Sequence, residues 1–179
     1  MDRGFGLATA FALLTAACGG AGGAGKGGAD DASKGSEHPL VGAPAPDFDL
    51  KAQYGGSRAS LGDSSGKVRI VDFWATWCEP CRESFPAYQK LQEKHGDDLV
   101  IIGLSVDDEP EGIKAFAKDT GVKFVLAWDE GQQISARYEP PTMPTSYLVD
   151  KKGIVRNVHA GFRSGDEQEV EREVTKLLE

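Results

Sequence analysis

Two cysteines separated by two residues, Cys78 and Cys81, are the residues of this sequence best suited to chemistry. The apolar, β-branched run Val68 to Val71 precedes them and a segment with helical spacing follows, so Cys78 is predicted to lie where a buried strand turns into a helix. At a helix N-terminus, unpaired N–H groups and the helix dipole favour an anion, and thiolate is the reactive form of cysteine. Cys81 lies one turn further on the same helix face, close enough to attack a mixed disulfide formed at Cys78. The pair is therefore predicted to cycle between dithiol and disulfide.

The residues around this pair carry a family resemblance. The segment Trp74-Ala75-Thr76-Trp77-Cys78-Glu79-Pro80-Cys81 resembles the active site of thioredoxin-fold proteins. Its Glu-Pro dipeptide most resembles the membrane-anchored TlpA/ResA-like thiol-disulfide oxidoreductases of bacteria, and the resemblance covers roughly Leu40 to Leu178. It implies an α/β thioredoxin fold: a central mixed β-sheet flanked by helices, with an N-terminal β-hairpin and a central helical insertion. It also implies that Trp77 and Pro80 shape the rim that meets the substrate.

Asp72 is the first candidate for proton transfer. It lies six residues before Cys78, within the apolar strand. Burying a carboxyl group there is energetically unfavourable unless the group is hydrogen-bonded or has a catalytic role. Thioredoxins carry a buried aspartate at this spacing, so the resemblance implies that Asp72 moves a proton to and from Cys81. Many TlpA/ResA-like proteins have Asn there instead. The alternative is a residue at the strand end that reaches solvent.

A second acid is implied near the end of the next strand. The TlpA/ResA-like family places an acid there that faces the cysteine pair, and Asp108 matches it best, with Asp107 as the rival. Asp108 would tune the thiols and shuttle a proton. The alternative is an acid that caps the helix beginning near Pro110.

A proline-rich segment supplies the candidate substrate-binding residues. Thioredoxin-fold proteins place a cis-proline just before a strand, beside the active cysteines, and Pro144 is the match because the predicted strand Ser146 to Val149 follows it. Cis peptide bonds are rare even before proline, so such a bond normally marks a tight, specific turn. The backbone at Met143 would pair with an extended substrate segment, and its side chain would give an adaptable apolar contact. Pro140 or Pro141 is the alternative cis residue.

The first residues resemble an export signal. Residues 1–17 hold Arg3 and the apolar run Gly4 to Ala17, which is too short to span a bilayer comfortably. Leu14-Thr15-Ala16-Ala17-Cys18 is similar to a bacterial lipobox, which implies that Cys18 is acylated; the alternative is an ordinary cleaved signal with an incidental cysteine. Residues 18–38 are predicted to be a flexible, Gly-rich tether. Residues 39–179 then form the thioredoxin-like domain, lipid-anchored in the cell envelope and facing the periplasm or cell exterior.

Hydrophobic periodicity and turn residues predict the remaining elements. Alternation at Phe48 and Leu50, followed by Gly55-Gly56, indicates a hairpin whose second strand lies near residues 58–61. Because strands and helices alternate through the centre, a mixed sheet with helices on both sides is expected. The other predicted strands are 68–74, 99–106, 124–128, 146–149 and 154–158, and the predicted helices are 78–96, 110–120, 132–138 and 166–178.

Composition limits the function classes. The 179 residues carry a formal net charge of −8, whereas nucleic acid and anionic lipid need a basic surface. A structural zinc site needs four nitrogen or sulfur ligands, which two clustered cysteines and the scattered His38, His95 and His159 do not obviously supply. We therefore expect a monomer without metal or cofactor, whose substrate is a protein thiol or disulfide.

The direction of electron flow is left open by the motif. The resemblance favours a protein-disulfide reductase that receives electrons from a membrane thiol carrier. A reductant in an oxidising compartment needs such a donor, because its cysteines must be reduced again after each turnover. The Cys-x-x-Cys-His haem sites of apocytochrome c are one candidate substrate, which would mean a role in cytochrome c maturation. The alternative is a thiol oxidant or isomerase that donates its disulfide.

Three other functions fit less well. A peroxiredoxin would have Pro and Thr seven and three residues before its cysteine, where this chain has Val71 and Ala75. A copper-delivery protein of the Sco type would have three residues between its cysteines. A non-enzymatic anchored adaptor would not need the complete set of Cys78, Cys81, Asp72 and Pro144.

Overall fold

The computed structural model describes residues 37–179. The predicted signal sequence, the lipidation site Cys18 and almost all of the predicted tether lie outside the described residues. In chain order the elements are β1 (Asp49–Tyr54), β2 (Arg58–Ser60), η2 (Gly62–Ser64), β3 (Val68–Trp74), α1 (Glu79–His95), η3 (Gly96–Asp98), β4 (Leu99–Ser105), α2 (Ile113–Thr120), β5 (Val125–Trp128), η4 (Glu130–Gln132), α3 (Ser135–Tyr138), β6 (Thr145–Val149), β7 (Val155–Ala160) and α4 (Asp166–Leu178).

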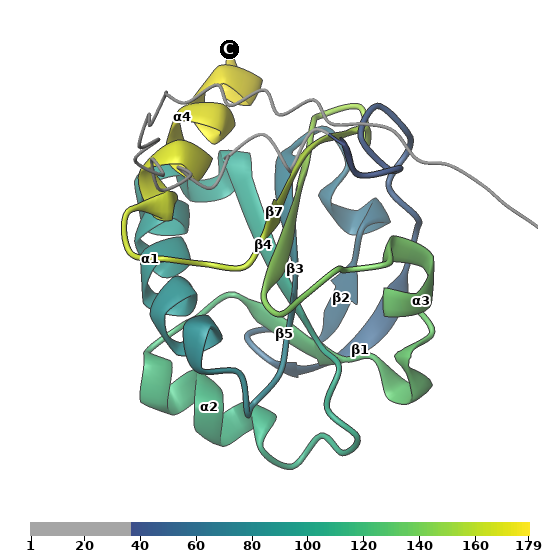
Figure 1. Ribbon diagram of the computed structural model, residues 1–179, viewed down its shortest axis with the longest axis vertical. Coiled ribbons are helices and arrows are strands. Elements are labelled where there is room, and N and C mark those ends of the chain that lie inside the picture. Colours follow the sequence, from purple (N-terminus) through teal and green to yellow (C-terminus); the bar gives the residue numbers. More distant parts are fainter. Residues whose placement is uncertain (1–36) are drawn as a thin grey trace, which may run out of the picture. The chain divides into compact units, whose positions relative to one another are not determined.

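The strands form one seven-stranded mixed sheet in the order β2-β1-β5-β4-β3-β6-β7. Strands β3, β4 and β5 are parallel, and the remaining pairs are antiparallel. Helices α1, α2 and α4 lie on one side of the sheet and α3 lies on the other (Figure 1). The predicted fold class is confirmed, including the N-terminal hairpin β1–β2 and the helix α2 inserted between β4 and β5.

The central strand β3 is buried along its whole length, and its side chains alternate between the two helical layers. Trp74 packs against Phe85 of α1 and Phe116 of α2, with ring centroids 4.8 and 4.5 Å apart. Phe73 points to the other side, where it contacts Tyr138 of α3 at 5.0 Å. The even-numbered residues of β3 therefore face the layer that contains α1.

Gly103 of β4 allows Trp74 to lie close to the neighbouring strand. A Cβ atom at position 103 would lie 3.0 Å from Trp74 Nε1 and 2.6 Å from a methyl group of Leu126. Both neighbours are fully buried and cannot move away freely. The glycine is thus required by packing beside the strand that leads to the cysteines.

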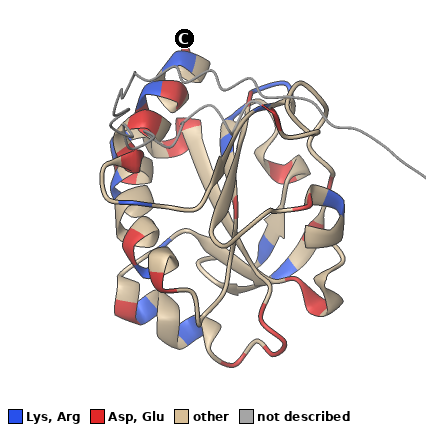
Figure 2. Cartoon of the chain, viewed as in Figure 1, with Lys and Arg blue, Asp and Glu red and all other residues tan. Residues whose placement is uncertain are grey.

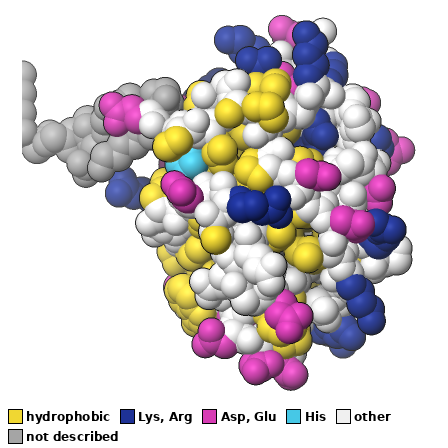
Figure 3. All heavy atoms as spheres, turned by 90° about the vertical axis from the view of Figure 1, so that its right-hand side faces the viewer, with side chains coloured by type: hydrophobic (Ala, Val, Ile, Leu, Met, Phe, Trp, Pro, Cys, Tyr) yellow, Lys and Arg dark blue, Asp and Glu magenta, His cyan; other side chains and the backbone are white. Residues whose placement is uncertain are grey.

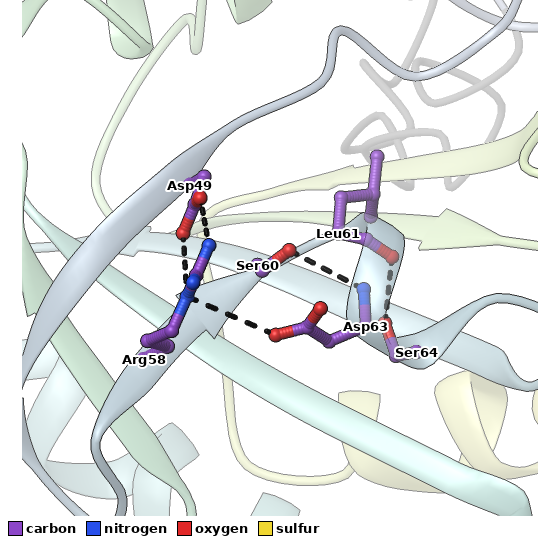
Figure 4. Close-up of polar contacts among 6 residues, drawn as sticks. All are labelled: Asp49, Arg58, Ser60, Leu61, Asp63 and Ser64. Atoms are coloured by element: carbon purple, nitrogen blue, oxygen red, sulfur yellow. Dashed lines mark hydrogen bonds and ion pairs between the residues drawn. The ribbon is translucent and has the colours of Figure 1, made fainter.

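The hairpin β1–β2 and the following η2 share a small polar cluster, whose charged side chains are exposed (Figure 4). Arg58 pairs with Asp49 and lies 4.0 Å from Asp63, while the Ser64 hydroxyl donates to the Leu61 carbonyl at 3.0 Å. The ion-paired side chains are about half exposed or more, so each pair contributes at most about 1 kcal/mol. Pairing of β1 with β5 joins the hairpin to the sheet.

Two predicted helix boundaries were wrong. The helix predicted over 132–138 begins only at Ser135, as α3, because Gln132 has a positive φ angle of 54° and belongs to the preceding η4. Asp129 then accepts hydrogen bonds from the N–H groups at the start of α3. Helix α2 begins at Ile113 rather than near residue 110, after a turn with Gly112 at the N-cap.

The folded part also begins slightly earlier than the predicted boundary at residue 39. The His38 ring packs edge-on against Tyr147, with centroids 5.3 Å apart, and its Nε2 lies 3.3 Å from the Glu139 carbonyl oxygen. His38 was assigned to the tether, but these contacts place it on the α3 side of the sheet.

The surface carries charges of both signs, and acidic residues gather in the loop between β4 and α2 (Figure 2). Apolar and charged side chains are interspersed on the face shown in Figure 3. Within residues 37–179, none of the helices combines the length and the apolar character needed to cross a membrane.

Candidate active site

Cys78 and Cys81 form a disulfide at the start of α1. Cys78 is the N-cap of the helix, and the Cys81 backbone N–H points at its sulfur, with an N–S distance of 3.3 Å. Pro80 lies in the first turn, where its missing N–H costs no helix hydrogen bond. The predicted position of Cys78 between a buried strand and a helix is confirmed, and it supplies the dipole and N–H group that favour a thiolate.

The disulfide is shielded from solvent, whereas its neighbours are exposed. Cys81 is fully buried and Cys78 is 3% exposed, but Trp77 is 70% exposed and Pro80 also lies at the surface. Among the described residues, Trp77 stands out as the exposed large hydrophobic side chain. Its role in substrate binding, like that of Pro80, stays a prediction.

The peptide bond between Met143 and Pro144 is cis, as predicted, and those before Pro140 and Pro141 are not. Thr145, the next residue, pairs with Phe73 near the end of β3, so the cis bond lies at the end of the sheet where β3 leads toward the cysteines. The Met143 side chain is partly exposed, so a partner can reach it. Contact of Met143 and Pro144 with a substrate stays a prediction.

Asp72 is fully buried on the side of the sheet that α1 covers, so the alternative of a solvent-reaching strand end is wrong. Its Oδ1 accepts a hydrogen bond from Ser146 Oγ at 2.5 Å, and Ser146 Oγ lies 2.8 Å from Tyr88 Oη of α1. Its Oδ2 has no hydrogen-bond partner within residues 37–179. Burial raises the pKa of Asp72 to about 7, and the hydrogen bond with Ser146 opposes that shift only in part. A carboxyl group in this state can gain or lose a proton near neutral pH.

The second acid in contact with the active-site segment is Asp107, the rival of the preferred Asp108. Asp107 is 8% exposed, and its carboxylate accepts hydrogen bonds from the Thr76 N–H at 3.0 Å, the Thr76 hydroxyl at 2.8 Å and the Ser105 hydroxyl at 2.6 Å. Asp108 is exposed and does not cap α2, whose N-cap is Gly112. The contacts therefore favour Asp107, and a role for Asp108 stays a prediction.

Sequence reasoning missed the partners of these two acids. Ser146 has a visible signal, because it is a small polar residue inside an apolar strand directly after the candidate cis-proline. Tyr88 lies within the predicted helix 78–96 but was given no role of its own, and Thr76 was named only as part of the motif. Their polar contacts depend on which strands and helices are neighbours, which periodicity does not reveal. Within the described part of the chain, no group of three or more His, Cys, Asp or Glu residues could hold a metal ion.

The mixed sheet, the cis-proline and a Cys-x-x-Cys disulfide at the head of a helix together define a thiol-disulfide oxidoreductase with the thioredoxin fold. Comparison with known proteins agrees. The chain is 37% identical to the thioredoxin-like protein YneN of Bacillus subtilis (strain 168), over 72% of this chain and 76% of YneN. It is 37% identical to the thiol-disulfide oxidoreductase ResA of Bacillus thuringiensis (strain Al Hakam), over 66% of this chain and 69% of that protein.

Solved structures and a family profile extend this likeness. The crystal structure assigned to a thiol:disulfide interchange protein DsbE from Chlorobium tepidum superimposes with a TM-score of 0.73 at 33% identity, covering 78% of this chain and 98% of that one. The profile of the AhpC/TSA family matches residues 41–158. The chain therefore belongs to the AhpC/TSA family, and within it to the TlpA/ResA-like thiol-disulfide oxidoreductases.

Proposed function

We propose that this enzyme is an extracytoplasmic reductase of protein disulfides, with the haem-site cysteines of apocytochrome c as one candidate substrate. The observation that carries the proposal is the Cys78–Cys81 disulfide at the N-terminus of α1, next to the exposed Trp77. A disulfide that can open and close at this position is what thiol-disulfide exchange requires, and its exposed neighbour offers a docking point for a protein partner. The N-terminal lipobox-like sequence supports export and anchoring at Cys18.

The reaction begins with the reduced enzyme. Cys78 thiolate attacks the substrate disulfide, one substrate sulfur leaves as a thiol after taking up a proton, and a mixed disulfide forms. Cys81 then loses its proton and attacks Cys78, which breaks the mixed disulfide, forms the Cys78–Cys81 bond and releases the second substrate thiol. The substrate gains two electrons and two protons: the enzyme supplies both electrons and the Cys81 proton, and the solvent supplies the other proton, which it received when Cys78 ionised.

In this mechanism, Asp72 accepts the proton of Cys81. Its free Oδ2, its complete burial and its pKa near neutrality suit a group that takes a proton from a thiol inside the protein. Asp107 orders the segment before Cys78 through Thr76. Met143 and Pro144 present backbone and an apolar side chain to an extended substrate segment. Cys78–Cys81 is then reduced again by another protein, for which a membrane thiol carrier is the natural class.

The reduction potential of the Cys78–Cys81 couple tests the direction of electron flow. The purified protein would be equilibrated with glutathione or dithiothreitol buffers, and its thiols counted by alkylation and mass spectrometry. A potential near that of thioredoxin, roughly −270 mV, supports a resupplied reductase. A potential near roughly −120 mV, as in strong oxidants, would contradict it and favour an enzyme that donates its disulfide. Mass analysis of the N-terminal peptide tests acylation of Cys18 separately.

A further inference from the structure

The hydroxyl groups of Ser146 and Tyr88 form a hydrogen-bonded chain that ends on the carboxyl group of Asp72. Ser146 Oγ lies 2.5 Å from Asp72 Oδ1 and 2.8 Å from Tyr88 Oη. Each of the three residues is at most 1% exposed. Hydrogen bonds strengthen one another in such an interior because the local dielectric constant is low. These hydrogen bonds connect β3, β6 and α1, and α1 also carries Cys81.

The direction of the hydrogen bonds follows from the available protons. An ionised carboxylate can only accept, so the single hydroxyl proton of Ser146 is donated to Asp72. Ser146 Oγ must then accept the hydroxyl proton of Tyr88. Burial raises the pKa of Tyr88 well above its ordinary value, so the phenol keeps its proton and serves as the terminal donor. The chain thus stabilises the ionised form of Asp72.

The other groups near these three residues do not take over the hydrogen bond that Ser146 donates to Asp72. On β4, the residue opposite the aspartate is Gly103, which has no side chain. On β7, the residue opposite the serine is His159, whose Nε2 lies 2.7 Å from Glu173 of α4. The charges of Asp166 and Glu173 act on the phenol from α4 and raise its pKa. Within residues 37–179, the serine hydrogen bond is the interaction that lowers the pKa of the buried carboxyl group.

We propose that Ser146 and Tyr88 are positioning residues for catalysis: they hold Asp72 by one oxygen, leave the other open, and set the pH at which it accepts the proton of Cys81. This inference deepens the proposed function, because it rests on the role of Asp72 in that reaction. It assigns a function to two residues that do not touch the substrate and that the cysteine motif does not include.

The test is an NMR titration of the Asp72 carboxyl carbon in the oxidised protein, where the cysteines do not titrate. Ser146→Ala should raise the Asp72 pKa by about one pH unit or more, because a carboxylate loses its donor. Tyr88→Phe should raise it by less, because Ser146 remains. Tyr147→Phe is the matched control: it removes a buried hydroxyl that donates to the Tyr138 carbonyl at 2.7 Å, on the opposite side of the sheet. It should leave the titration of Asp72 unchanged.

A second readout separates this inference from the proposed function. The rate at which Cys81 resolves a mixed disulfide would be followed against pH in the same variants, and its midpoint should move upward with the carboxyl titration. If the titration moves and the rate profile does not, Ser146 and Tyr88 control the pKa of Asp72, but the role of Asp72 as proton acceptor fails and with it the catalytic part of the inference. If Ser146→Ala and Tyr88→Phe leave the Asp72 titration unchanged in folded protein, the inference is overturned. An equal shift in Tyr147→Phe would also overturn it.

Discussion

Replacing Asp72 by asparagine should change how the stability of the oxidised protein depends on pH. The carboxyl group has a pKa of about 7 in the folded protein, against an ordinary value of 3.8. The folded state therefore binds more protons than the unfolded state between these values, so the Asp72 contribution to stability falls as the pH rises from about 4 to about 7. Asparagine does not titrate, and this fall should be absent from the variant.

The size of the effect follows from the pKa difference. An interval of about 3 pH units, at about 1.4 kcal/mol for each unit, corresponds to about 4 kcal/mol as an upper limit. The asparagine oxygen can still accept the Ser146 hydroxyl, but its amide N–H groups would occupy the unpaired Oδ2 position at a cost of about 1–3 kcal/mol. The variant should therefore be more stable than wild type by about 1–3 kcal/mol near pH 8 and less stable than wild type by about 1–3 kcal/mol near pH 4.

Equilibrium urea unfolding at several pH values measures this directly. The decisive quantity is the difference in unfolding free energy between Asp72→Asn and wild type, compared at about pH 4 and about pH 8. The fixed cost of the amide is the same at both pH values and cancels from this comparison. Asp98→Asn, at an exposed position just before β4, is the control and should follow wild type. Parallel stability curves for Asp72→Asn and wild type would refute the assignment of a raised pKa. If the curves diverge as expected, slower resolution of mixed disulfides in Asp72→Asn would add support for the proton-acceptor role.

Three further predictions concern the cysteines and the segment before them. Cys78→Ser should abolish disulfide reduction, whereas Cys81→Ser should accumulate mixed disulfides on non-reducing gels; normal turnover by Cys81→Ser would rule out the two-step mechanism. Gly112→Ala would place a Cβ 2.9 Å from the Thr76 methyl group and should lower the free energy of unfolding by about 1–3 kcal/mol. Adding Thr76→Ser, which removes that methyl and keeps the hydroxyl, should recover most of the lost stability. If the effects of the two substitutions on the free energy of unfolding simply add, the contact is unimportant. Asp107→Asn should cost about 1–3 kcal/mol and slow thiol exchange, because Thr76 loses a charged acceptor; wild-type behaviour in both assays would argue against this.

The sequence by itself determined the fold class and the reactive pair. The apolar run of β3, the Cys-x-x-Cys spacing and the helical periodicity after it are local features, so they placed Cys78 at the start of a helix without any knowledge of distant contacts. Pro144 was also predictable, because the family resemblance implies a cis-proline just before a strand and Pro144 precedes the predicted strand 146–149. The positive φ angle at Gln132 was not predicted from periodicity, and the helix expected over 132–138 begins only at Ser135.

The tertiary structure decided which polar groups meet. Asp107 and Asp108 are adjacent and chemically identical in sequence, yet only the path of the chain after β4 turns one carboxylate onto Thr76 and the other into solvent. Likewise, Ser146 reaches Asp72 because β6 pairs with β3 in one particular register, and a shift of one residue would place its hydroxyl on the opposite face. Long-range pairing sets these contacts, and with them the acidity of the buried carboxyl group.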